Sequence, residues 1–532
     1  MSRAIQILLL VTAAAYVGLW HAGFVWDDIP LIVQNRALAD ASFGALFTSD
    51  LWADTGAGDV ASGYYRPMVL LSFAVDRSLF GLDPGGYHLH SLVWHLLSMV
   101  MLHRLVRPLM GPGAALLAVA VFGLHPAQSE VVAWISARND LMATALGFGA
   151  LSLLWDGTSP SIKRACLAAL ITMAAAMSKE TAFTLPVLLG VADWARGQRD
   201  GFWQRQAPVV LGVGVVVLWR AALGLGEAAI PSAAGVALLS SNGWELLGGY
   251  GASLVSPWPL SSAKDLSWVG LQPVWRTVVG LGFIGVLVVS WATAPQEQRR
   301  IAGLGFVWAI VFLGITLVPT ADKGGYGDRF LYWPLAGVGI AIGALVGHQW
   351  RLLVPAVVIP AMLILHLRLP DWANDRALWG AAVRDVPSST NEVSLGHALT
   401  LHARHKRAHV SFVSALAREG IDLDGCGAVA GSAMRMGLPR QALRMGEWAI
   451  ARGCVATGPM NGWMATAAAL RGEWDKASRW AHGTPSDPRH RDLIVRAVLA
   501  RRDGDEAGYA AIEADWIGAD PLAPQVEALL VR

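Results

Sequence analysis

Two adjacent carboxylates, Asp27 and Asp28, directly follow the first apolar run of the chain, residues 5–25. Charge is expensive to bury at the edge of a bilayer, so an acidic pair in this position is a candidate functional site. A partly buried carboxylate has a raised pKa, which suits it to accept a proton from a hydroxyl group. Asp27 is therefore the candidate general base, and Asp28 is expected to orient the loop or to bind substrate. The simpler alternative is that the pair ends the helix and caps the segment that follows.

A third acidic candidate, Glu130, lies in residues 125–140, where a proline and several polar residues interrupt an apolar hairpin. His125 begins this segment, and both side chains are expected to face the cavity that holds Asp27. Glu130 would then bind the acceptor or support the base. The alternative is that Glu130 only occupies the first turn of a helix that begins near Ser129, where acidic residues are favoured.

Two cations are placed where they suit a phosphate group. Lys179 joins two short apolar runs with almost no loop between them, and Arg329 begins a later apolar run. A lysine offers a point charge, and an arginine offers bidentate hydrogen bonds to phosphate oxygens. The alternatives are that Lys179 extends to water at the membrane surface and that Arg329 pairs with Asp328 or anchors the interface. The sequence has no acid-rich metal motif, so we expect neither a cofactor nor an essential metal.

Membrane helices must position these residues. The chain has 532 residues, of which 54% are hydrophobic and 15% are charged, whereas soluble proteins have roughly 25% charged residues. The deficit of charge lies before about residue 370, so we expect an all-α polytopic membrane domain over residues 1–370 and a soluble domain over residues 371–532. About eleven apolar segments are candidate transmembrane helices: residues 5–25, 88–105, 112–124, 141–155, 165–178, 181–194, 207–224, 273–294, 301–319, 330–347 and 352–369.

Two further segments are expected to lie at the membrane interface. Residues 68–80 are too short and too charged to span, so they are predicted to form an amphipathic helix with Pro67 in its first turn. Residues 81–85 contain glycine and proline and are expected to end this helix. Residues 233–258 are weakly apolar and are interpreted as an interfacial or re-entrant segment.

Basic residues gather in the short loops on one side of the predicted helices, which assigns that side to the cytoplasm. The acidic pair, residues 125–140, Lys179 and Arg329 all fall on the opposite side. An odd number of transmembrane helices places residues 371–532 on that outer side as well. The polar residues of the membrane domain therefore converge on one face. The expected location is the bacterial inner membrane, with the C-terminal domain in the periplasm.

Small residues recur in the C-terminal region with a period near 34 residues. Each pair consists of a residue before a helix–helix turn and an alanine early in the next helix, which is typical of tetratricopeptide repeats. The pairs are Ala403 with Ala408, Gly437 with Ala442, and Gly472 with Ala477. Such arrays bind peptides or partner proteins. Cys426 and Cys454 could form a disulfide if this domain faces an oxidising compartment.

Taken in order, these motifs resemble the transmembrane O-mannosyltransferases with tetratricopeptide repeats and their bacterial relatives, within the GT-C class of polyprenyl-phosphate-sugar-dependent glycosyltransferases. The matching motifs are Trp26-Asp27-Asp28, Tyr65-Arg66-Pro67, His125-Pro126 with Glu130 to Ser136 and Arg138-Asn139-Asp140, Ser178-Lys179-Glu180-Thr181, and Asp328-Arg329-Phe330-Leu331-Tyr332. The resemblance implies that Arg66, His125, Arg138 and Tyr332 also bind substrate, and it suggests mannose as the sugar. Residues 226–267 depart from the family pattern. Of the properties that the resemblance implies, those of the acceptor-facing side are therefore the least transferable to this chain.

The predicted function is transfer of a sugar from a polyprenyl-phosphate donor to a hydroxyl acceptor, by direct displacement with inversion. The repeat domain favours protein Ser/Thr as the acceptor over a lipid or a glycan, and no nucleic-acid partner is expected. A transporter or flippase of polyprenyl-linked sugars would use the same cavity and cations without an aligned base, but the inverted repeats typical of transporters are not found. A non-enzymatic membrane anchor that displays a repeat scaffold would explain residues 371–532 but not the polar residues on the outer face.

Overall fold

The computed structural model describes most of the chain, which forms two compact units, Met1–Leu378 and Trp379–Arg532. The described residues are 2–39, 43–53, 55, 62–155, 158–225, 247–255, 264–265, 274–323, 325–346, 349–418, 423–455, 458–482, 499–500, 503–505 and 507. Most of the predicted segment 233–258 lies outside them, and its residues 247–255 are helical.

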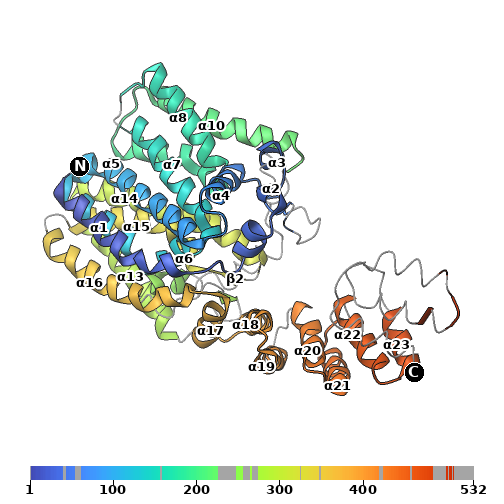
Figure 1. Ribbon diagram of the computed structural model, residues 1–532. Helices are drawn as coiled ribbons and strands as arrows, with labels where there is room; N and C mark the ends of the chain where they lie inside the picture. The colour runs from blue at the N-terminus through green and yellow to red at the C-terminus, as the bar shows by residue number, and fades with distance from the viewer. Residues whose placement is uncertain are drawn as a thin grey trace. The chain divides into compact units, whose positions relative to one another are not determined.

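The first unit is built from long apolar helices (Figure 1). Among the described residues, seven helical segments are long and apolar enough to cross a membrane. They are α1 (Arg3–Tyr16) with its extension η1 (Val17–His21), α5 (Pro84–Leu124), α10 (Phe202–Ala222), α13 (Val274–Thr293), α14 (Gln296–Lys323), α15 (Tyr332–Val346) with the preceding turn η5 (Asp328–Leu331), and α16 (Trp350–Arg368) with η7 (Leu369–Trp372). The prediction of an all-α polytopic membrane protein is confirmed.

The predicted transmembrane segments all fall on helices, but not one to one. Residues 88–105 and 112–124 are the two halves of α5, which is kinked where Gly111 has φ 78° between Pro108 and Pro112. Prolines inside a helix remove backbone hydrogen bonds and force such a bend. The predicted segments 141–155, 165–178 and 181–194 are shorter than the roughly 20 residues that cross a bilayer. They correspond to α7 (Arg138–Leu154), α8 (Ile162–Ala176), and α9 (Leu185–Ala195) with the preceding turn η4 (Glu180–Thr184).

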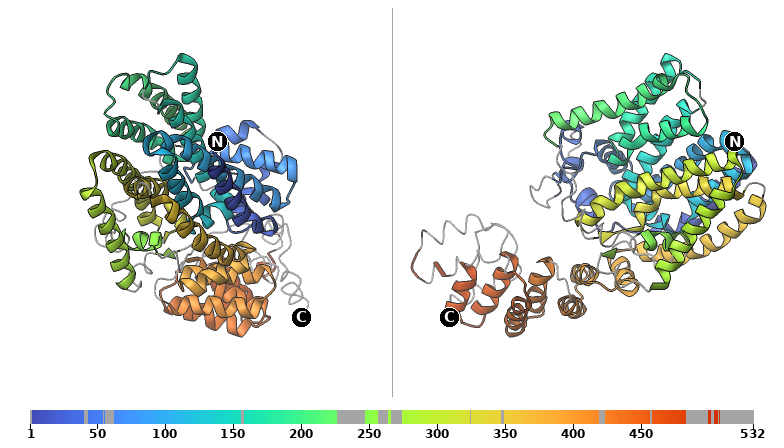
Figure 2. Two further views of the ribbon diagram at one scale, coloured as in Figure 1. Left: turned by 90° about the vertical axis from the view of Figure 1, so that its left-hand side faces the viewer. Right: turned by 180° about the vertical axis from the view of Figure 1, so that it is seen from behind.

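Helix α15 packs closely against both α14 and α5, and the two views of the ribbon show these helices side by side (Figure 2). A Cβ atom on Gly337 would lie 2.5 Å from the backbone oxygen of Gly305 in α14. A Cβ atom on Gly339 would lie 2.5 Å from the backbone oxygen of Ala118 in α5. Small residues allow such close backbone contact between membrane helices. This packing fixes η5, at the start of α15, relative to the end of α5.

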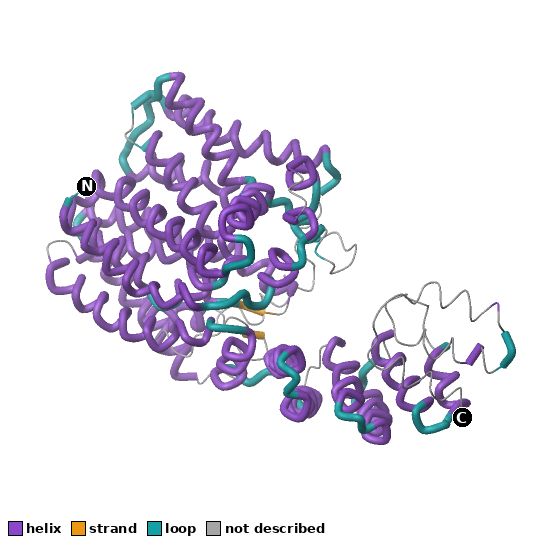
Figure 3. Tube along the Cα trace, in the orientation of Figure 1, coloured by secondary structure: helices purple, strands orange, loops and turns teal. Residues whose placement is uncertain are grey.

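Shorter elements connect the long helices at the end where η5 lies. The predicted helix over residues 68–80 is confirmed as α4, with Pro67 at its first turn and Gly81 at its end with φ 61°. Two short strands pair antiparallel, with Lys264 opposite Tyr326 (Figure 3). The elements of this group are η2 (Ile29–Val33), α2 (Arg36–Ala39), α3 (Phe43–Thr48), α4 (Pro67–Phe80), α6 (Gln128–Ala133), η3 (Ile135–Ala137) and the two strands β1 (Lys264–Asp265) and β2 (Gly325–Tyr326).

The second unit consists of helical hairpins, preceded by α17 (Asp375–Asp385), which crosses from the first unit into the second. Its helices are α18 (Ser389–Leu401), α19 (His405–Ala417), α20 (Leu423–Arg435), α21 (Pro439–Ala451), α22 (Gly458–Ala469) and α23 (Trp474–Ala481). Consecutive helices pack as the pairs α18 with α19, α20 with α21, and α22 with α23.

The predicted turn residues lie between the two helices of each hairpin. Ala403, Gly437 and Gly472 have φ values of 54°, 71° and 72°, in the left-handed region that ends helices. The alanine five residues after each of them is fully buried. These positions confirm the prediction of helical repeats in this region; their assignment to the tetratricopeptide class stays a prediction.

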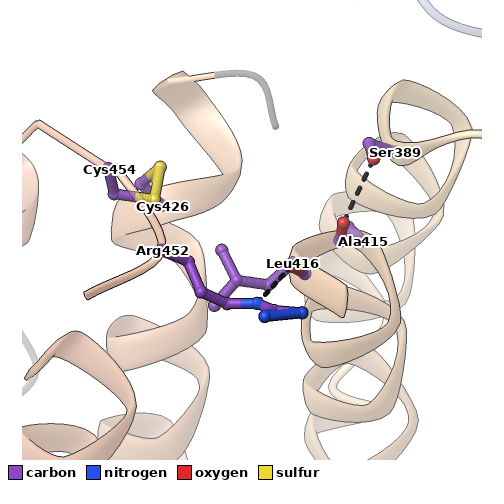
Figure 4. Close-up of a disulfide and its surroundings, with 6 residues drawn as sticks. All are labelled: Ser389, Ala415, Leu416, Cys426, Arg452 and Cys454. Atoms are coloured by element: carbon purple, nitrogen blue, oxygen red, sulfur yellow. Dashed lines mark hydrogen bonds between the residues drawn. A yellow bond between two sulfur atoms is a disulfide. The ribbon is translucent and has the colours of Figure 1, made fainter. Parts of the chain in front are cut away.

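A disulfide joins Cys426 in α20 to Cys454, which follows α21 (Figure 4). The sequence allowed this pairing, and the structure forms it. Beside it, Nε of Arg452 donates a hydrogen bond to the backbone oxygen of Leu416 at 3.3 Å, which joins this hairpin to the preceding one. Cys166 in α8 is exposed and free.

Candidate active site

Asp28 is fully buried and shapes the loop that carries the acidic pair. One carboxylate oxygen accepts hydrogen bonds from the backbone N–H and the hydroxyl of Ser136, at 2.7 and 2.6 Å. The other accepts one from the N–H of Val25 at 3.1 Å. Burial raises the pKa of Asp28 to about 7, although these hydrogen bonds oppose the shift, and the negative charge of Asp27 adds to it. Asp28 thus ties residues 25–28 to η3.

Asp27 is more exposed to solvent than Asp28. Its side chain is partly accessible to solvent, and its carboxylate makes no hydrogen bond within the part of the chain that the structure describes. Burial raises the pKa of Asp27 to about 6, and the positive charge of Arg329 limits the rise. A carboxylate with free lone pairs and a pKa near 6 can take up a proton close to neutral pH.

Arg329 is held by Glu130. Its Nη1 donates to Oε1 of Glu130 at 2.6 Å, and its backbone N–H donates to Oε2 at 3.1 Å. Glu130 is buried, and both of its carboxylate oxygens accept hydrogen bonds from this one residue. Gly327 leaves the room for this pair, because a Cβ atom there would overlap Nη1 of Arg329 and lie 2.9 Å from Oε1 of Glu130. The sequence analysis offered Asp328 as an alternative partner of Arg329, and the structure pairs Arg329 with Glu130.

An aromatic stack lies against the same arginine. The rings of Trp26 and Trp134 are stacked with centroids 4.5 Å apart and planes 9° apart. The guanidinium carbon of Arg329 lies 5.6 Å from the Trp26 centroid and 5.4 Å from the Trp134 centroid, which is within the range of cation–π attraction. Arg329 is therefore held both by the tryptophan stack and by Glu130.

Lys179 is mostly enclosed. Its Nζ donates to Oδ2 of Asp140 at 2.6 Å, and its side chain is 12% exposed. It therefore does not extend to water, which was the simpler alternative for this residue. Burial lowers the pKa of Lys179, while Asp140 opposes that shift and Arg66 adds to it.

Arg66 belongs to the same cationic group. Its Nε and Nη2 donate to Oε2 of Glu180 at 3.2 and 2.8 Å, and Nη1 of Arg220 approaches Oε1 of Glu180 at 3.5 Å. Burial would raise the pKa of Glu180, but the charge and hydrogen bonds of Arg66, a backbone hydrogen bond and the charge of Arg220 together lower it. The group of Arg66, Lys179 and Arg220 with Asp140 and Glu180 therefore carries one surplus positive charge. We call it the cationic cluster.

Arg138 and Tyr332, which the resemblance assigns to substrate binding, form hydrogen bonds with other residues of the protein. Arg138 is fully buried, and its guanidinium donates to Asp76 of α4 and to Ser91 and the Tyr87 carbonyl of α5. The hydroxyl of Tyr332, also fully buried, is hydrogen-bonded to Nδ1 of His95 at 2.9 Å. Arg138 and Tyr332 therefore join helices in this structure, and their contact with substrate stays a prediction.

His125 lies at the end of α5. Its Nε2 lies 3.2 Å from the backbone oxygen of Leu254, and its Nδ1 accepts a hydrogen bond from the N–H of Ala127. Burial lowers the pKa of His125 to about 4. The ring is therefore neutral near pH 7, and it can donate a hydrogen bond but not act as a cation.

One short segment, from α6 to the first turn of α7, contacts every part of this site. Within it, Ser136 binds Asp28 and Asp140 binds Lys179. These two residues are four positions apart, which is about 6 Å along a helix. The acidic loop and the cationic cluster are therefore neighbours. Sequence reasoning assigned no role to Asp140 or to Glu180. A buried carboxylate in an apolar setting requires a cation nearby, and this rule could have paired them with Lys179 and Arg66.

Fold and site together define an all-α polytopic membrane protein with a polar site at one end of its helices. In this site the carboxylate of Asp27, which has no hydrogen bond to the described residues, lies near the cationic cluster. Several relatives are protein O-mannosyl-transferases. The chain is 30% identical over 181 residues to protein O-mannosyl-transferase Tmtc1 of Drosophila melanogaster, covering 34% of this chain and 21% of that protein. It is 31% identical over 214 residues to Tmtc2 of the same organism, covering 37% and 22%.

Protein O-mannosyl-transferase TMTC3 of Mus musculus is 27% identical over 143 residues, covering 27% of this chain and 16% of that protein. The chain therefore spans about a fifth of the length of these relatives. No protein-family model matches it, and no solved structure matches it. These relatives confirm the resemblance to the protein O-mannosyl-transferases, while the bacterial branch and the GT-C class stay predictions.

Proposed function

We propose that this protein is an integral membrane glycosyltransferase that moves a sugar from a polyprenyl-phosphate donor to a hydroxyl acceptor, with Asp27 as the general base. One observation carries the proposal. Asp28, Glu130, Asp140 and Glu180 all accept hydrogen bonds from other residues, whereas the Asp27 carboxylate accepts none within the described structure. The names of the relatives support a protein acceptor and mannose as the sugar.

The reaction needs few groups. The acceptor oxygen attacks the anomeric carbon while Asp27 takes the hydroxyl proton, and the bond from that carbon to the phosphate oxygen breaks. The lipid phosphate leaves with the bonding electron pair, and the direct displacement inverts the anomeric centre. Lys179 and Arg66 would stabilise the negative charge on the phosphate, because the cationic cluster has a surplus positive charge. Arg329 keeps Asp27 partly ionised at neutral pH and is a second candidate for the phosphate.

We place the site and residues 371–532 on the outer side of the membrane, as in the periplasm of a bacterium. The disulfide between Cys426 and Cys454 supports this location, because disulfides persist in oxidising compartments. The helical hairpins would bind the acceptor polypeptide. A membrane-impermeant thiol reagent applied to reduced whole cells should label these two cysteines, and labelling only after lysis would reverse the orientation.

The test of function is sugar transfer by purified protein from a polyprenyl-phosphate mannose to a Ser/Thr peptide. In Asp27→Asn the carboxamide keeps the size of the side chain but cannot accept the proton, so turnover should fall by roughly two to four orders of magnitude while donor binding is retained. Asp200→Asn is the matched control, since Asp200 is an exposed carboxylate and should keep parental activity. Parental turnover in Asp27→Asn would remove the base from the mechanism. Lipid movement across vesicles without transfer would instead identify a flippase.

A further inference from the structure

The loop that carries Asp27 is tied to the chain that follows the last long apolar helix. The N–H of Gly23 donates to the backbone oxygen of Ala373 at 3.0 Å. The N–H of Trp26 donates to Oδ1 of Asp375 at 2.7 Å, across 349 positions of sequence. A hydrogen bond to an ionised carboxylate is roughly twice as strong as one between neutral groups. Residues 23–26 are therefore fixed by a segment that the sequence analysis did not connect with the site.

Trp26 has a backbone conformation that requires such support. Its φ is 54°, in the left-handed region that is unfavourable for an aromatic L-residue. Strained residues of this kind persist where the surroundings hold them, and they gather at functional sites. Here the ring is held by stacking on Trp134, and the backbone is held by Asp375.

The conformation of Trp26 decides where Asp27 points, because Asp27 is the next residue in the chain. On the other side, the backbone oxygen of Asp27 accepts a hydrogen bond from the N–H of Leu31 at 3.0 Å, and the N–H of Asp28 donates to the oxygen of Val25 at 3.0 Å. Both bonds hold the peptide group that follows Asp27, and the peptide group that precedes it is held by the N–H of Ile29, which donates to the backbone oxygen of Trp26 at 3.2 Å. The backbone on both sides of Asp27 is thus fixed while its carboxylate makes no hydrogen bond to the described residues. A base that is aimed only by its backbone depends on whatever holds that backbone.

We infer that Asp375 is a positioning residue for Asp27: its carboxylate holds the Trp26 backbone in the left-handed region and so aims the base at the acceptor hydroxyl. The inference rests on the proposed function. Asp375 is also the first residue of α17, the helix that crosses into the second unit. The chain that leads to the helical hairpins therefore begins with a residue on which the geometry of the base depends.

Two variants and one matched control test this inference in the full-length protein. Asp375→Ala removes the acceptor, and a base displaced by about 1 Å can lose up to a hundredfold in rate, so kcat should fall between about tenfold and a hundredfold with the donor KM unchanged. Asp375→Asn keeps a neutral acceptor oxygen and should lose less. The control is Asn374→Ala, because Oδ1 of Asn374 accepts from the N–H of Ala377 and caps the same helix without contacting Trp26. It should keep the parental kcat.

Two further readouts separate positioning from a loss of folded protein. Releasing the loop exposes Asp27 to water and weakens the burial that raises its pKa, so the acidic limb of the kcat profile should move to lower pH in Asp375→Ala. Hydrogen exchange of the Trp26 amide, which does not depend on transfer, should become faster in Asp375→Ala and stay parental in Asn374→Ala. Equal effects of the Asp375 and Asn374 variants would overturn the inference, because both would then act through α17.

Failure of this inference is distinct from failure of the proposed function. A parental enzyme that transfers sugar, with an Asp375→Ala variant that keeps kcat, the acidic limb and the Trp26 exchange rate, overturns the inference alone. A parental protein that transfers no sugar overturns the proposed function and this inference with it.

Discussion

Replacing Gly327 with alanine tests the arrangement of the base and its arginine without altering any charged group. An added Cβ would overlap Nη1 of Arg329 and lie 2.9 Å from Oε1 of Glu130. The end of at least one of the two side chains must shift, so the Arg329–Glu130 contact of 2.6 Å is expected to lengthen. A hydrogen bond between charged groups contributes about 1.5–3 kcal/mol. The variant should therefore lose roughly ten- to a hundredfold in kcat/KM if Arg329 acts in transfer.

The pH dependence gives the sharper signature. Arg329 lowers the pKa of Asp27, so moving the cation away must raise that pKa and shift the acidic limb of the profile to higher pH. For two charges about 6 Å apart at an effective dielectric constant of about 20, a displacement of about 2 Å changes their interaction by about 0.7 kcal/mol, which is about half a pH unit. His125 does not obscure this limb, since burial lowers its pKa to about 4.

The assay is steady-state sugar transfer measured from pH 5 to pH 8. Gly285→Ala is the matched control, because Gly285 lies in α13 and a Cβ atom there would meet no atom within 4 Å. It should retain the parental rate and the parental limb. If Gly327→Ala keeps both as well, then Arg329 neither tunes Asp27 nor serves the reaction, and its contact with Glu130 is only structural.

Further predictions concern stability and titration. Ala403→Gly should stabilise the helical hairpins by about 0.5–1 kcal/mol, because glycine relieves the left-handed backbone at φ 54°; Gly437→Ala should do the opposite, and a thermal shift of the same sign in both variants would contradict this reasoning. Reducing the bond between Cys426 and Cys454, which are 28 positions apart, should lower the free energy of unfolding of the second unit by about 3–4 kcal/mol in the chain-entropy description, measured by denaturant unfolding with and without reductant. Transfer should decline as the pH falls through about 6, where Asp27 becomes protonated and can no longer act as a base; a rate that stays constant from pH 7 to pH 5 would exclude this role.

The sequence by itself determined where the helices of this protein lie and which residues begin a helix or form the turn between two helices. Hydropathy located the apolar helices, since the bilayer demands long runs of apolar residues whatever their neighbours are. Pro67 marked the start of α4, and the period of Ala403, Gly437 and Gly472 marked the turns of the helical hairpins. These features are local, because they follow from the backbone preferences of one residue or from one segment's own composition.

Only the tertiary structure decided which polar side chains meet. Glu130 and Arg329 are 199 positions apart, and Asp28 and Ser136 are 108 positions apart. The close packing of α15 against α5 and α14 brings Arg329, at the start of α15, to Glu130 just beyond the end of α5. No single motif encodes such a contact between distant segments. Arg138, which the family resemblance assigned to substrate, is enclosed by contacts with α4 and α5. The carboxylate of Asp27 has no hydrogen-bonding partner among the described residues, and its cationic neighbour Arg329 is bound to Glu130.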